Sequence, residues 1–287
     1  MLRPWLVVCL AVAPAPARAQ PYDAYGLQLG WRCEADTFRG AAQLGLWSNE
    51  SREFIGLVQY GLATNRVSDR FAGALQLGFY NDSWALFAHA QIGAINITRG
   101  QLAAGLQLGA VNSNTKVNMV LLQVGGLNHT ERRHVGLVQL GLANWYRRGE
   151  FYGGVQLALM NYAEGGDNGF FGLAQIGVFN YFDPGVHGGL QIGAINVVRL
   201  RLVGIGQVGL LNGATTFTGL AQLGVINATI ETMRGLQIGQ LNWARNVYGA
   251  QIGIVNITRR LRGVQLGLLN LSRDGGLPVS LVLNIGW

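Results

Sequence analysis

The chain has 287 residues, of which 49% are hydrophobic, 12% are charged and 43 are glycine, and its formal net charge is +7 at pH 7. Charged residues make up about half the share that is usual for a soluble domain. Low charge combined with high apolar content excludes a disordered chain. No apolar run of about 18 residues follows the N-terminal segment, so no transmembrane helix is expected.

Residues 1–19 have the pattern of a secretory signal peptide. Arg3 gives a positively charged start, residues 5–12 are apolar, and Ala17-Arg18-Ala19 is a small-x-small cleavage site. Removal of this segment leaves Cys33 as the only cysteine and, with Arg3 and Arg18 gone, a net charge of +5. One thiol forms no intramolecular disulfide and no cysteine-based metal site. We therefore expect an exported protein whose residues 20–287 form a single repeat-built β domain.

A short phrase with the pattern Gly-x-Gln-(Leu/Ile)-Gly-x-x-Asn recurs along almost the whole chain, as in residues 105–112 and 263–270. Successive glutamines are separated by 14 to 17 residues, with a single gap of 19. Self-similarity at a fixed period indicates a repeat architecture, and a residue used sixteen times has a structural task. The sixteen glutamines are Gln28, Gln43, Gln59, Gln76, Gln91, Gln107, Gln123, Gln139, Gln156, Gln175, Gln191, Gln207, Gln222, Gln237, Gln251 and Gln265.

Each repeat is predicted to be one strand and one turn, because β-formers and glycine dominate and the alternation around each Gln has period two. One face of the strand is aliphatic and the other shows Gly-Gln-Gly. The glutamines are interpreted either as a structural amide ladder between strands in register or as the lining of a pore. The asparagines are predicted to mark the turns: Asn96, Asn112, Asn128, Asn144, Asn161, Asn180, Asn196, Asn212, Asn227, Asn242, Asn256 and Asn270.

The favoured architecture is a closed antiparallel β-barrel of the outer-membrane type, with about 16–18 short strands built from repeats of roughly 16 residues. The final strand places Val279, Leu281, Leu283, Ile285 and Trp287 on one face. It resembles the C-terminal signature strand of bacterial outer-membrane barrels, and also a seventeenth repeat with Asn284 in the place of the Asn.

Aromatic residues at two places in the repeat are predicted to form the two aromatic girdles of such a barrel. The first place is five residues before Gln, and the second directly follows Asn. The residues are Phe38, Phe54, Phe71, Phe151, Phe170 and Phe217, and then Trp145, Tyr162, Tyr181 and Trp243.

The alternative architecture is a β-solenoid with one repeat per coil and ladders of Gln and Asn along it. Its best support is the even spacing of the glutamines. Antiparallel membrane barrels have short turns at one end and longer loops at the other, so alternate spacings should differ.

The phrases GLQLG, GLQIGAIN and GVQLGLLN resemble the repeats of bacterial surface repeat-containing proteins, first named from leptospires and found in other Gram-negative bacteria. The resemblance covers essentially all of residues 26–287. It implies export and a cell-envelope location, and it supplies no catalytic residues.

No constellation of residues points to catalysis or to a cofactor. His89, His129, His134 and His187 lack zinc-type spacing, and His129 and His134, which share a connector with Glu131, are interpreted as part of a solvated loop. The basic residues are scattered among the connectors, so neither nucleic acid nor a metal is expected as a partner. Attraction to anionic lipid is expected instead.

These observations favour a non-enzymatic cell-envelope protein. The leading hypothesis is an outer-membrane β-barrel that acts as a passive pore or a structural surface element. The alternative is a secreted or surface-attached β-solenoid that binds a partner or a glycan. The expected partners are outer-membrane lipid and the envelope assembly machinery.

Overall fold

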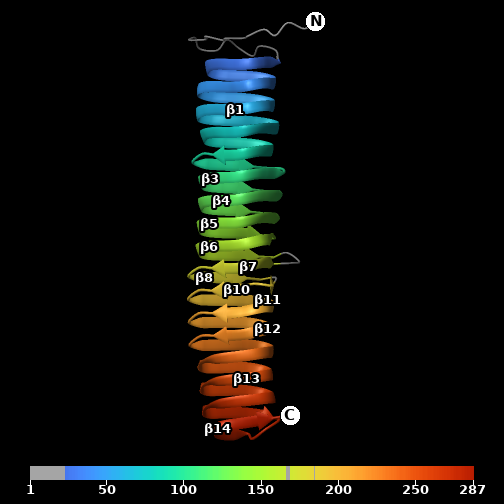
Figure 1. Cartoon of the computed structure of the whole chain (residues 1–287), viewed down its shortest axis with the longest axis vertical. Coiled ribbons are helices and arrows are strands. Elements are labelled where there is room, and N and C mark those ends of the chain that lie inside the picture. Colours follow the sequence, from blue (N-terminus) through green and yellow to red (C-terminus); the bar gives the residue numbers. More distant parts are fainter. Residues whose placement is uncertain (1–22, 166–168, 184) are drawn as a thin grey trace. The chain divides into compact units, whose positions relative to one another are not determined.

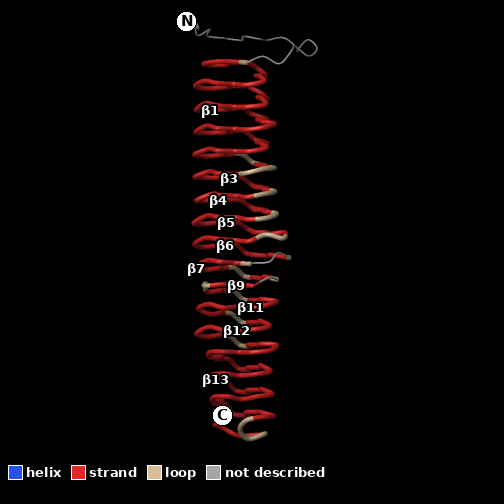
Figure 2. The backbone as a smooth tube through the Cα atoms, turned by 90° about the vertical axis from the view of Figure 1, so that its right-hand side faces the viewer, coloured by secondary structure: helices blue, strands red, loops and turns tan. Residues whose placement is uncertain are grey.

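The computed structural model describes residues 23–165, 169–183 and 185–287, and the predicted signal peptide lies outside them. The described residues are almost entirely β-strand and include no helix (Figure 2). The chain divides into two compact units, residues 1–141 and 142–287, and the boundary falls inside strand β5 (Arg133–Arg147). Each unit is described by itself below.

The first unit is a stack of parallel coils, one repeat to each coil (Figure 1). Gln91 pairs in register with Gln107 and Gln107 with Gln123, so each glutamine lies beside its equivalent in the next repeat. The strands preceding β5 are β1 (Ala24–Ile92), β2 (Ile95–Thr98), β3 (Leu102–Asn114) and β4 (Val117–Thr130).

The second unit is built in the same way. Gln207 pairs in register with Gln222, and Asn196 with Asn212, in parallel orientation. Its further strands are β6 (Glu150–Glu164), β7 (Phe170–Ile176), β8 (Phe179–Phe182), β9 (Gly185–His187), β10 (Leu190–Ile192), β11 (Ile195–Val208), β12 (Leu211–Leu223), β13 (Ile226–Asp274) and β14 (Val279–Gly286).

The all-β prediction is confirmed, but the antiparallel barrel is wrong: each unit is a β-solenoid, the alternative architecture. Consecutive repeats pair in parallel, as β3 does with β4 and β11 with β12. A coil returns to the same point after a nearly constant number of residues, which explains the even spacing of the glutamines. The antiparallel strand β14 follows the last repeat and pairs with its final coil, with Asn284 opposite Gln265.

The coil bends after Asn, where the sequence predicted a turn, as at residues 115–116, and it also bends between Gln and Asn, which the sequence did not predict. In the coil that starts at Gln207 the chain bends at Gly209 and Leu210, and a new strand begins at Leu211. Because the bend breaks the alternation, the neighbouring side chains of Leu210 and Leu211 both point outward. This explains the paired apolar residues that stand before most of the asparagines.

The interior of each unit combines amide ladders with a column of apolar side chains five residues before Gln. In the first unit Phe38, Phe54 and Phe71 are fully buried and stacked, with ring centroids 5.0 and 4.7 Å apart. In the second unit Phe151 and Phe170 stack at 5.1 Å. The predicted aromatic girdle at this position is therefore wrong, because Phe38, Phe54, Phe71, Phe151, Phe170 and Phe217 all belong to the core.

Candidate functional site

The predicted glutamines form a buried hydrogen-bonded ladder in each unit, here called the Gln ladder. Each Gln donates from Nε2 to Oε1 of the Gln one coil earlier. The donor–acceptor distances are 2.6–2.9 Å from Gln28 to Gln139 and 2.7–3.1 Å from Gln156 to Gln265. Because these side chains lie in the packed interior of a solenoid, they have no barrel lumen to line.

The asparagines form a second buried ladder that runs in the opposite direction. Each Asn of this Asn ladder donates from Nδ2 to Oδ1 of the Asn one coil later, at 2.7–2.9 Å. Most also donate to a backbone carbonyl of the following coil, as Asn112 does to Val124 at 2.9 Å. The amide dipoles of the two ladders therefore oppose each other, which reduces the net dipole of the interior.

Three members of the Asn ladder were not predicted: Asn49, Asn65 and Asn81. Asn49 and Asn65 stand six residues after their Gln, one more than in the later repeats, whereas Asn81 stands five residues after Gln76. A search that allowed either spacing would have found all three.

A glycine two residues after Gln makes room for the Asn ladder. A Cβ atom on Gly209 would lie 2.1 Å from the carbonyl oxygen of Gly193 and 2.6 Å from Nδ2 of Asn196. A Cβ on Gly193 or Gly253 would meet the same surroundings. The glycine in the repeated phrase is thus required by the close approach of the neighbouring coil.

The predicted C-terminal strand folds back on the last coil as β14. Val279, Leu281, Leu283, Ile285 and Trp287 are all exposed, whereas Ser280, Asn284 and Gly286 face inward. Asn284 does not continue the Asn ladder, as a seventeenth repeat would require. Its partner is Gln265 of the Gln ladder, and it lies opposite that residue in the antiparallel pair.

His134 is buried in the column five residues before Gln, so its interpretation as part of a solvated loop is wrong. Burial lowers its pKa to about 3. No group of three or more His, Cys, Asp or Glu in the described ranges could hold a metal ion. Cys33 is buried, and its Sγ donates to the carbonyl of Leu44 at 3.4 Å.

The outer surface of each unit carries a strip of exposed apolar side chains, here called the apolar edge. It consists of the residues two before, one after and three after each ladder Gln. Alternation from the inward Gln turns the two later positions outward, whereas the position two before Gln is exposed although alternation alone would place it on the same face as Gln. In none of the sixteen repeats is any of these three positions Asp, Glu, Lys or Arg. Leu220 and Leu173, both two residues before Gln, are 74% and 71% exposed.

The charged residues gather about half a coil away, at the bend eight and nine residues after Gln, here called the charged corner. Thirteen of the sixteen repeats have a charged residue at one of these two positions. Arg52 bridges Asp36 at 2.9 Å and Asp69 at 3.6 Å, and Arg199 pairs with Asp183 at 3.3 Å. Hydrogen bonding to Asp36 raises the pKa of Arg52.

Between the apolar edge and the charged corner lie the aromatic residues that follow Asn. Trp145 and Trp243 are each 38% exposed, and the rings of Tyr162 and Tyr181 stack at 5.1 Å. Their prediction as the second aromatic girdle of a barrel is wrong, because each unit is a solenoid.

Comparison with known proteins gave no match to a family model, to a curated protein or to a solved structure. No helix long and apolar enough to cross a membrane occurs in the part of the chain that the structure describes.

Proposed function

We propose that the chain is a non-enzymatic, exported β-solenoid that attaches to the lipid surface of the cell envelope through its apolar edge. The observation that carries the proposal is the inverted arrangement of the coil: amides fill much of the interior while leucine, isoleucine and valine face outward. Contiguous exposed apolar surface of this kind marks an interaction site. The absence of charged residues from this edge in all sixteen repeats supports an apolar partner along the edge.

The order of residue types around the coil supports lipid over a second protein. Aliphatic residues of the apolar edge are followed by Trp145, Tyr162, Tyr181 and Trp243 and then by the charged corner. Tryptophan and tyrosine prefer the boundary between hydrocarbon and water, and arginine favours anionic headgroups or water beyond it. The predicted signal peptide and the resemblance to surface repeat-containing proteins point to the same location.

Vesicle flotation tests the proposal with two variants that make the same chemical change on opposite sides of the coil. Leu173→Asp combined with Leu220→Asp places two charges on the apolar edge. Leu200→Asp combined with Ile230→Asp does so at the charged corner, where both side chains are 56% exposed. We expect the wild type and the second variant to float with vesicles of zwitterionic and anionic lipid, and the first variant to lose most of this binding.

Two outcomes would refute the proposal. The first is equal flotation of the two variants with vesicles. The second is a wild-type chain that does not bind vesicles and instead forms a stable dimer. In that case Leu173→Asp with Leu220→Asp would convert the dimer to a monomer in sedimentation equilibrium without lipid. That second outcome would assign the apolar edge to another copy of the chain.

A further inference from the structure

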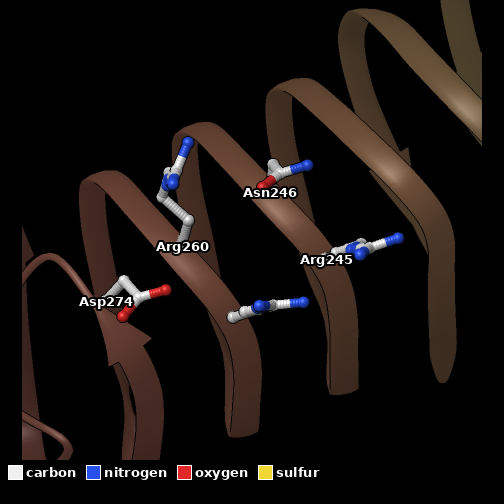
Figure 3. A pocket seen from close by; sticks show the side chains of 5 residues that line it. Arg245, Asn246, Arg260 and Asp274 are labelled. Atoms are coloured by element: carbon white, nitrogen blue, oxygen red, sulfur yellow. The ribbon is translucent and has the colours of Figure 1, made fainter.

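The charged corner of the last coils in the second unit contains an open groove of about 290 Å³. It is lined by Arg245, Asn246, Arg259, Arg260 and Asp274. Figure 3 shows Arg245, Asn246 and Arg260 extending outward from the bends of neighbouring coils, with Asp274 at the C-terminal end.

The groove is strongly basic. Between residues 245 and 274 the chain has five arginines and one acidic residue, Asp274, which gives a local net charge of +4. One of the five, Arg262, lies over the ring of Tyr248 at 5.5 Å and is not among the residues that line the groove. The three arginines of the lining have only Asp274 as an acidic neighbour within the groove.

Some arginines of other coils are neutralised by an acid of a neighbouring coil. Arg52 meets Asp36 at 2.9 Å and Arg99 meets Asp82 at 2.8 Å. None of the ion pairs between described residues includes Arg245, Arg259 or Arg260.

The spacing of the repeat stacks these charges. Arg245 and Arg259 are 14 residues apart, the same interval that separates Gln237 from Gln251. They therefore occupy the same place in consecutive coils, about 4.8 Å apart along the stack. The single hydroxyl hydrogen of Thr258 lies within reach of the carbonyl oxygens of Arg245 in the previous coil, at 3.3 Å, and of Arg260 in its own coil, at 3.0 Å. Guanidinium groups that extend from neighbouring coils repel each other, and an anion between them removes this repulsion.

We propose that this groove binds a ligand that carries two or more phosphate groups. Guanidinium groups bind phosphate through paired N–H donors, and a row of them on successive coils offers one such site for each coil. Asp274 bounds the row, so the phosphates lie over Arg245, Arg259 and Arg260. The inference does not depend on membrane attachment, because the groove lies about half a coil from the apolar edge.

The binding of tripolyphosphate to the full chain tests this assignment by isothermal titration calorimetry. Arg259→Gln combined with Arg260→Gln should weaken binding by about tenfold or more, the scale of a lost charge-assisted contact. The control variant, Arg52→Gln with Arg70→Gln, removes the same net charge from ion-paired arginines of the first unit and should change affinity by less than about twofold. Equal losses in both variants would mean that only net charge matters and would overturn the proposal, as would undetectable binding to the wild type.

A second experiment, with vesicles, distinguishes phosphates on a lipid headgroup from phosphates on a ligand that is free in solution. Vesicles that contain a bisphosphorylated lipid are compared with phosphate-matched vesicles of ordinary phospholipid. If Arg259→Gln with Arg260→Gln weakens binding only to the bisphosphorylated vesicles, the phosphates belong to a lipid. If it weakens only tripolyphosphate binding, the ligand is free in solution. Leu173→Asp with Leu220→Asp should leave tripolyphosphate affinity unchanged, so this inference and the proposed membrane attachment fail separately.

Discussion

The side-chain amide of Asn284 closes the Gln ladder by donating from Nδ2 to Oε1 of Gln265 at 3.2 Å. Along each ladder a Gln donates to the Gln one coil earlier, so the last one, Gln265, has no following Gln to donate to its oxygen. Strand β14 returns antiparallel to the last coil and places Asn284 opposite Gln265. Asn284 is itself fixed by two bonds of 2.9 Å to the backbone of Leu277.

Replacement of Asn284 by alanine should loosen the end of the second unit. The oxygen of Gln265 would lose its donor, and the N–H and carbonyl of Leu277 would lose their partner, at a cost of about 1–3 kcal/mol. Hydrogen exchange should show the fastest new exchange in residues 263–271, which pair with β14. Leu281→Ala, on the exposed side of the same strand, is the control and should leave that exchange nearly unchanged. Equal protection in both variants would show that Asn284 does not secure the end.

A break in the middle of the ladder should cost more than a break at its end. In Gln207→Leu, Gln191 loses a donor and Gln222 loses an acceptor, both in the buried interior. Two orphaned groups predict a loss of about 2–5 kcal/mol in the free energy of unfolding. Gln240→Leu makes the same chemical change on an exposed side chain and should have an effect below about 0.5 kcal/mol. Urea denaturation followed by circular dichroism measures both, and similar midpoints for the two variants would contradict the ladder's structural role.

The sequence was sufficient to identify the Gln ladder and most of the Asn ladder, because the phrase that contains them repeats along the chain. It was not sufficient to place the phenylalanines. Phe54 and Gln59 are five residues apart, so simple alternation puts them on opposite faces, yet both are fully buried. The alternation of buried and exposed side chains changes phase between them. The neighbouring coil approaches closely in this stretch, where a Cβ on Gly56 would lie 2.5 Å from the carbonyl oxygen of Gly40.

The groove at the charged corner could have been partly found from sequence. Arg245, Arg259 and Arg273 follow each other at the 14-residue interval of the last repeats, which already predicts a stacked row in a solenoid. In the barrel interpretation the same arginines would be separated by intervening strands. Whether these arginines form one site therefore depends on the architecture. The architecture in turn depends on the parallel pairing of consecutive coils, which the sequence alone did not establish.

Two glycines of one coil should respond to alanine in opposite directions. In Gly209→Ala the new Cβ would lie 2.1 Å from the carbonyl oxygen of Gly193, so the backbone of one coil must move. We expect a loss of at least about 2 kcal/mol. In Gly213→Ala the nearest atom to the new Cβ is 3.9 Å away, and a smaller unfolded-state entropy should stabilise the chain by about 0.4–1 kcal/mol. Thermal unfolding should therefore shift down for the first variant and up for the second, and a downward shift of equal size in both would show that the close approach at Gly209 is not the cause.

The buried imidazole of His134 should make the first unit sensitive to acid. Its pKa is lowered from 6.5 to about 3 by burial, so the folded state keeps it neutral where the unfolded state binds a proton. Its contribution to stability is complete above the unfolded pKa and is lost as the pH falls from about 6.5 toward 3, at about 1.4 kcal/mol per pH unit. His134→Leu, which places an apolar residue in the column of Leu86 and Leu102, should flatten this dependence in urea unfolding measured between neutral and mildly acidic pH. His89→Leu removes an exposed histidine and should leave the slope as it is in the wild type. If the wild type and His134→Leu lose stability at the same rate below pH 6.5, the acid sensitivity comes from other groups, and the burial of His134 does not control it.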